Sequence, residues 1–146
     1  MSTDITSKII GTWRLVSCTA QASDGQVSYP YGKNAQGRAN LEPGRFAFQV
    51  LNPDRRKFPS VDPHSASDVE MREAFEGYLA YYGSLSFHPE NSTIVNRVEA
   101  ASIPNWVGTD QVRYYRFEND RLVLRTPPML RGGVEFINTI VWERLT

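Results

Sequence analysis

Short runs in which apolar and polar residues alternate, each bounded by turn residues, constrain this chain more than any other feature. A period of two gives a strand one face in the core and one in solvent. The predicted strands are Thr12–Ala20, Val27–Tyr31, Gly37–Leu41, Arg45–Leu51, Leu79–His88, Thr93–Ser102, Gln111–Phe117, Leu122–Thr126 and Val134–Arg144. They predict an all-β fold in one domain, residues 1–146, as an antiparallel barrel of about eight strands. The alternative is a closed sandwich with a filled core.

One segment departs from this pattern and predicts a short helix. Ser67 and Glu70 have the spacing of a capping box, and helix-forming residues continue up to Gly77. We therefore predict a helix from Asp68 to Glu76. The preceding Pro-rich segment, Asn52–Ser67, is not regular, and we expect this segment and the helix to cover one mouth of the barrel.

Composition excludes several classes of function. Sixteen Lys and Arg residues balance sixteen Asp and Glu residues, which argues against nucleic-acid and anionic-membrane partners. One cysteine and two histidines give little material for a metal site, and Gly-rich phosphate loops are absent from the sequence. We expect no metal and no cofactor. The first twenty residues lack a signal-peptide core, so a cytoplasmic protein is expected.

Hairpin register predicts which side chains point inward. A two-residue Asn119–Asp120 turn pairs Phe117 with Leu122, and residues opposite each other share a face. The same reasoning on the other strands gives an inward polar set: Ser17, Tyr81, Asn96, Arg113, Tyr115, Thr126 and Asn138. Cys18 is expected to face outward, although a single β-bulge would reverse the face of every residue beyond it.

Apolar walls with a few polar groups are typical of a small-molecule pocket. The predicted apolar lining consists of Phe46, Phe48, Phe87, Trp106, Phe117 and Phe136. The alternative is a dry core in which the hydroxyl and amide groups bond to one another. Arg113 is costly to bury alone, so either Glu99 or Asp110 reaches it, or an anionic or enolic ligand binds it.

Several longer motifs resemble the lipocalin-like domain family of small bacterial and fungal proteins. They are GTWRLVS at Gly11–Ser17, YPYG at Tyr29–Gly32, GYLAYYG at Gly77–Gly83, PNWVGTDQVR at Pro104–Arg113, RLVLRTPPMLRGG at Arg121–Gly133 and VWERL at Val141–Leu145. The resemblance implies an eight-stranded barrel around a ligand cavity. It also implies that Trp13 plugs a closed end with Arg144 lying over it. Family members often carry a His-His pair where this chain has Asn96 and Arg97, so that source of a general base is absent.

The inward polar set suggests an enzyme without a cofactor. We predict an isomerase or cyclase, or a dehydratase, that acts on a hydrophobic oxygenated metabolite such as a polyketide. Arg113 would stabilise an enolate, and Tyr115 or Tyr81 would transfer a proton. Asn96 and Asn138 would orient carbonyl groups.

Two other functions fit the same residues. In the first alternative the barrel carries such a metabolite without changing it, and Ser17, Thr126 and Asn138 are ligand contacts. In the second, the barrel is a scaffold with a filled interior. Exposed aromatic residues such as Tyr114 are compatible with a homodimer.

Overall fold

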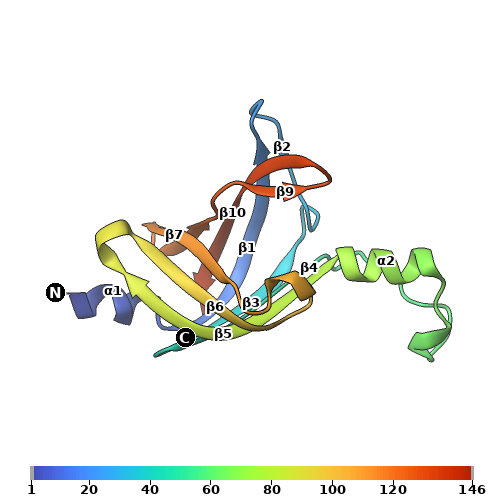
Figure 1. The fold of residues 1–146 in the computed structure, drawn as a ribbon, viewed down its shortest axis with the longest axis horizontal. Coiled ribbons are helices and arrows are strands. Elements are labelled where there is room, and N and C mark those ends of the chain that lie inside the picture. Colours follow the sequence, from blue (N-terminus) through green and yellow to red (C-terminus); the bar gives the residue numbers. More distant parts are fainter. Residues whose placement is uncertain (1, 146) are drawn as a thin grey trace.

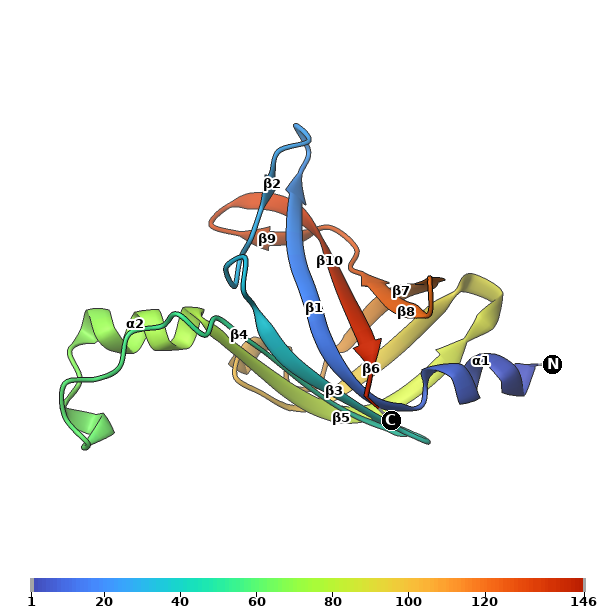
Figure 2. The ribbon, with the colours of Figure 1, turned by 180° about the vertical axis from the view of Figure 1, so that it is seen from behind.

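The computed structural model describes residues 2–145, with side chains from residue 5 onward. Within these residues, eight antiparallel strands close into a barrel, which confirms the predicted fold class (Figures 1 and 2). The barrel strands are β1 (Gly11–Ala22), β3 (Gln36–Glu42), β4 (Arg45–Leu51), β5 (Tyr78–His88), β6 (Thr93–Ala101), β7 (Asp110–Glu118), β8 (Arg121–Arg125) and β10 (Val134–Arg144). Pairing of β1 with β10 closes the sheet. The short strands β2 (Val27–Ser28) and β9 (Met129–Arg131) extend β1 and β10.

The predicted register of the β7–β8 hairpin is confirmed. Phe117 lies opposite Leu122 across the β7–β8 turn, where Asn119 and Asp120 have φ values of 50° and 68°. Positive φ at both central residues is the geometry of a type I′ turn, which matches the twist of the two strands. Phe87 lies opposite Ile94 on β5 and β6, which are joined through the short helix η2 (Pro89–Asn91).

A β-bulge in β1 overturns the predicted face of two residues. The register with β10 shifts between Leu15 and Ser17, so one extra residue lies in β1 at this point. Beyond the bulge, Cys18 lies opposite Ile140, is buried, and faces the barrel interior. The predictions that Ser17 points inward and Cys18 outward are therefore wrong, because the extra residue exchanges the two faces.

One end of the barrel is closed by the helix α1 (Ser2–Ile9), which the sequence patterns did not predict. Trp13 Nε1 donates a hydrogen bond to the Ile9 carbonyl at 2.9 Å, and both residues are fully buried. The Arg144 guanidinium lies 4.4 Å from the centre of the Trp13 indole ring and donates to the carbonyl groups of Ile10 and Lys8. The expected Trp13–Arg144 cation–π pair is thus present at this closed end.

The predicted helix is present, but it does not cover a mouth of the barrel. α2 (Asp68–Glu76) begins with a capping box in which Ser67 and Glu70 satisfy each other's backbone N–H groups. Together with the short helix η1 (Pro63–Ser65), it extends away from the barrel (Figures 1 and 2). β4 and β5 remain paired up to Leu51 and Tyr78, so they carry the helix out beyond the wall. No helix within residues 2–145 is long and apolar enough to span a bilayer.

Candidate functional site

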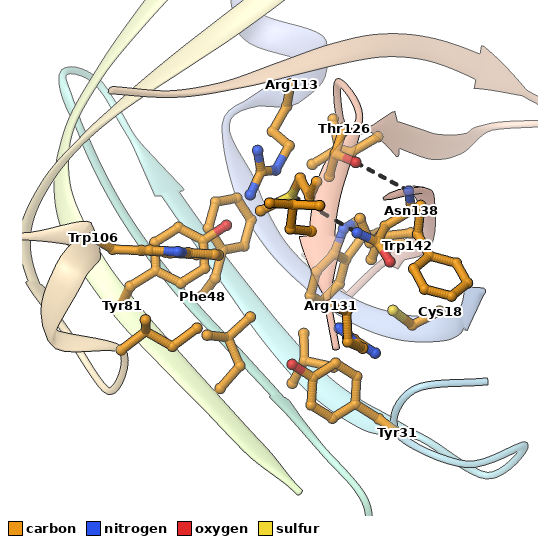
Figure 3. A pocket seen from close by; sticks show the side chains of 18 residues that line it. Cys18, Tyr31, Phe48, Tyr81, Trp106, Arg113, Thr126, Arg131, Asn138 and Trp142 are labelled. Carbon is orange, nitrogen blue, oxygen red and sulfur yellow. Dashed lines mark hydrogen bonds between the residues drawn. The ribbon is translucent and has the colours of Figure 1, made fainter. Parts of the chain in front are cut away.

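A cavity of about 270 Å³ occupies the half of the barrel that lies away from Trp13 (Figure 3). It is open to solvent at the mouth where β9 and the short helix η3 (Pro104–Trp106) lie. Seven residues predicted from the sequence line it: Phe48, Tyr81, Trp106, Arg113, Thr126, Phe136 and Asn138. The alternation of side chains therefore identified the inner face of β4, β5, β7 and β10 in this half of the barrel, but not that of β1.

The other predicted site residues do not line the cavity. They are Ser17, Phe46, Phe87, Asn96, Tyr115 and Phe117. Except for Ser17, all of them lie inside the closed half of the barrel or at its edge, where side chains fill the interior. Lys8 of α1, for example, lies 5.8 Å from the centre of the Phe117 ring. Strand alternation gives the face of a residue but not its depth along the barrel axis.

The remaining lining residues were not among the predicted site residues. They are Cys18, Tyr31, Val50, Leu79, Ile103, Leu124, Met129, Leu130, Arg131, Ile140 and Trp142. Cys18 was missed because of the bulge in β1, and Tyr31 because its strand ends at Ser28. Arg131 lies in β9, which was not predicted; the adjacent Gly132 and Gly133, both with positive φ, were the available turn signal.

Aromatic side chains from four elements form one wall of the cavity. The ring centres of Phe48 and Tyr81 are 5.4 Å apart, and Trp106 meets Tyr81 edge to face at 5.0 Å. Trp142 lies 5.8 Å from Phe48. The carbonyl of Trp106 accepts a 2.6 Å hydrogen bond from the Thr109 hydroxyl, which holds the η3 turn in place. This wall offers rigid, flat apolar surface to a bound ring.

Arg113 of β7 points into the cavity, with its guanidinium beside the aromatic wall (Figure 3). The residue is only 4% exposed; its Nη1 donates to the Val112 carbonyl at 2.8 Å, and its guanidinium lies 5.9 Å from the Trp106 ring centre. Neither acidic partner considered above reaches it, because Asp110 pairs with Arg97 at 3.4 Å and Glu99 is exposed beside a bulge in β6. Among the described residues, no carboxylate forms an ion pair with Arg113.

Burial favours the neutral forms of two titratable groups in the cavity wall, Cys18 and Tyr31. Burial raises the pKa of the Cys18 thiol to about 11 and that of the Tyr31 phenol to about 12, although nearby Arg131 lowers both. No histidine or carboxylate lines the cavity in the part of the chain that is described. His88 lies outside it and contacts the Ser86 hydroxyl at 3.1 Å. Within the same residues, no cluster of three His, Cys, Asp or Glu side chains could hold a metal ion.

Two further polar atoms in the cavity wall have no hydrogen-bond partner among the described residues. They are the side-chain carbonyl oxygen of Asn138 and the indole Nε1 of Trp142, both buried. Asn138 itself is well positioned, since its backbone N–H donates to the Thr126 hydroxyl at 3.0 Å (Figure 3). The cavity therefore presents one unused acceptor and several unused donors among apolar side chains.

Comparison with known proteins gives two findings. A model of the lipocalin-like domain matches residues 10–145 of the chain. The chain is also similar to the 4'-hydroxy-3'-methoxypropiophenone carrier protein ppsC of Aspergillus oryzae, with 34% identity over 104 residues. This alignment covers 66% of the chain and 94% of the relative.

Proposed function

Because the chain belongs to the lipocalin-like domain family, we propose that it binds a hydrophobic, oxygenated aromatic molecule inside its barrel and carries it unchanged. The observation that carries this proposal is the cavity of about 270 Å³, walled by aromatic side chains and interrupted by a few polar groups. A cavity of ~150 Å³ suffices for benzene, so this one suits a substituted ring or two fused rings. The name of the Aspergillus oryzae relative, a carrier of an aryl ketone, agrees in chemical class.

The side chains of the cavity support carriage over proton transfer. An efficient general acid or base has a pKa close to the working pH. The pKa values of Cys18 and Tyr31, about 11 and 12, keep both groups protonated and weakly acidic near neutral pH. The remaining charged groups in the wall, Arg113 and Arg131, are guanidinium cations that do not release protons under these conditions.

One observation favours a second function, the cofactor-free isomerase or cyclase predicted above. Arg113 is a desolvated cation in contact with the cavity, where it could stabilise negative charge that develops on an enolate oxygen. In this proposal Tyr81 would supply a proton and Asn138 would orient a carbonyl group, since both line the cavity. Tyr115 and Asn96 are less well placed for catalysis because they do not line it.

Calorimetric titration with 4'-hydroxy-3'-methoxypropiophenone, followed by mass-resolved chromatography of the mixture, tests both functions. For a carrier, we expect saturable binding of one molecule per chain and recovery of the compound with unchanged mass and retention. Cys18→Phe, which fills the cavity, should lower the affinity at least ~10-fold. Ser17→Phe is the matched control, because its side chain lies on the other face of the same strand.

The outcomes separate the two functions. A new peak of unchanged mass, or one that has lost water, would favour the enzyme. Equal binding by wild type and Cys18→Phe would show that the molecule binds outside the cavity, and the carrier proposal would then be wrong.

A further inference from the structure

The guanidinium group of Arg113 is the strongest polar feature of the cavity that carriage of an apolar molecule leaves unexplained. One hydrogen bond from its Nη1, to the neighbouring Val112 carbonyl, is present among the described residues. A guanidinium has five N–H donors and stays protonated at any pH at which the protein folds. Most of its N–H groups are therefore without a hydrogen-bond partner among the described residues, although the residue is only 4% exposed.

The surroundings of Arg113 do not compensate its charge. Its neighbours include the Trp106 ring, 5.9 Å from the guanidinium, and the fully buried Ile94, which lies opposite Arg113 on β6. A cation–π contact recovers only part of the hydration that a buried cation loses. The wall does not contain a carboxylate among the described residues. The site therefore has an excess of positive charge inside a cavity with mainly apolar walls, where an anion binds more strongly than at the open surface.

Arg131 is the other arginine in the cavity wall, and it is exposed to solvent, whereas Arg113 is buried. It lies at the mouth, on the exposed strand β9, with its guanidinium 5.9 Å from the centre of the Tyr31 ring. Water can hydrate it, so it needs no ionic partner. Arg113, by contrast, points into the cavity beside the aromatic wall, so a ring bound against this wall would have its substituent within reach of the guanidinium (Figure 3).

We infer that the ligand carries an ionised oxygen on its ring system, a carboxylate, a phenolate or an enolate, and that Arg113 binds this oxygen directly. The inference rests on the proposed binding function and adds the charge of the ligand to it. Further polar groups of the same molecule would donate a hydrogen bond to the side-chain oxygen of Asn138 and accept one from Nε1 of Trp142. The fork of N–H donors in a guanidinium suits two oxygens of one carboxylate or two neighbouring oxygens of an acidic phenol.

The test compares two probes of equal shape, 2-naphthoate and 2-naphthamide, by calorimetry with the full chain. We expect wild type to bind the anion at least ~10-fold more tightly, the usual scale of a charge-assisted hydrogen bond. Arg113→Met should remove this preference by weakening 2-naphthoate while changing 2-naphthamide less than about 3-fold. Arg116→Met is the matched control and should keep the preference, because its exposed side chain pairs with Glu118 and lies on the outer face of the same strand, β7. Arg113→Gln serves as a second neutral variant if Arg113→Met does not fold.

A spectroscopic arm distinguishes a phenolate from a carboxylate ligand. 4-Nitrophenol absorbs at a different wavelength when ionised, so binding at Arg113 should shift its spectrum toward the phenolate at a pH where the free compound is mostly neutral. A shift that Arg113→Met abolishes supports recognition of a phenolate. Preference for 2-naphthoate without any shift of 4-nitrophenol supports a carboxylate.

Different results would show whether the carrier function or the role of Arg113 is wrong. Equal affinity of wild type for 2-naphthoate and 2-naphthamide would overturn the inference and leave the carrier function standing. Loss of the preference in Arg131→Met but not in Arg113→Met would also overturn it. If neither naphthalene probe nor the propiophenone binds, the proposed function is wrong and the inference is wrong with it.

Discussion

The buried charge of Arg113 is costly to the ligand-free protein. Its charge is buried among aromatic and aliphatic side chains with a hydrogen bond to Val112 and a distant contact with Trp106. Replacing uncompensated buried charge by an apolar side chain of similar size generally stabilises a protein. The residue that we expect to bind the ligand should therefore destabilise the unliganded barrel.

Arg113→Met should raise the free energy of unfolding of the ligand-free protein by about 1–2 kcal/mol. Urea denaturation measures this change, and the melting temperature should rise by about 3 °C for each kcal/mol. Arg131→Met, at the exposed mouth, is the control and should change stability by less than ~0.5 kcal/mol. A clear loss of stability in Arg113→Met would mean that the contacts of Arg113 with Val112 and Trp106 outweigh the cost of burying its charge.

We expect the free energy of unfolding to depend on pH through the thiol of Cys18. Its pKa is raised from 9.0 to about 11 by burial, so the folded protein holds the thiol proton more tightly than the unfolded chain does. The resulting stability is complete below pH 9 and is lost as the pH rises toward 11. Between pH 8 and 10.5, wild type should lose about 2 kcal/mol more than Cys18→Ser, which has no thiol to ionise. Parallel loss in the two proteins, measured by urea denaturation, would contradict this assignment.

At the scale of elements, the long connection between β4 and β5 is separate from the site. None of the residues in α2 is buried, and none lines the cavity. The connection is held to the barrel near its base, where Asn52 N–H donates to the Gly77 carbonyl at 2.8 Å and Arg55 lies over the Tyr78 ring at 5.0 Å. The two strand ends are therefore already adjacent without the helix.

Replacing residues 53–76 with an Asn-Gly turn should leave a folded barrel with its ligand affinity changed by less than about 2-fold. Asn52 and Gly77 are bonded neighbours, so a two-residue type I′ turn can join them. Circular dichroism and the propiophenone titration together check this expectation. A ~10-fold loss of affinity in a folded variant would show that the segment closes over the mouth when a ligand binds.

The whole molecule is a barrel with two unlike halves. In the closed half, α1, Trp13 and the aromatic side chains of Tyr115 and Phe117 fill the interior. In the open half, the aromatic wall and Arg113 surround the cavity. Close packing in the filled half stabilises the barrel, whereas side chains around the cavity make fewer contacts. Stability and ligand binding should therefore depend largely on different residues.

Arg144→Met should test this division. Loss of the 4.4 Å contact with Trp13 and of the hydrogen bonds to Ile10 and Lys8 should lower the free energy of unfolding by about 1–2 kcal/mol. Ligand affinity should change by less than about 2-fold, because Arg144 lies away from the cavity. Arg121→Met, whose exposed side chain lies 3.9 Å from Glu143, is the control and should be nearly neutral.

Local sequence patterns determined the barrel, its hairpin registers and the helix after Ser67. Alternation in β7, β8 and β10 also placed Arg113, Thr126 and Asn138 on the inner face correctly. These predictions succeed because the face of a strand residue and the type of a turn depend on residues close in sequence.

Tertiary structure alone decided the depth of each inward residue and the location of the cavity. Phe46 and Phe48 share a face of β4, yet only Phe48 lines the cavity, because the closed half is filled by residues distant in sequence. The bulge that exchanges Ser17 and Cys18 depends on how β1 must bend to pair with β10. Whether Arg113 meets a carboxylate was likewise decided by the pairing of Arg97 with Asp110 outside the barrel, because ion pairs between strands depend on the assembled sheet.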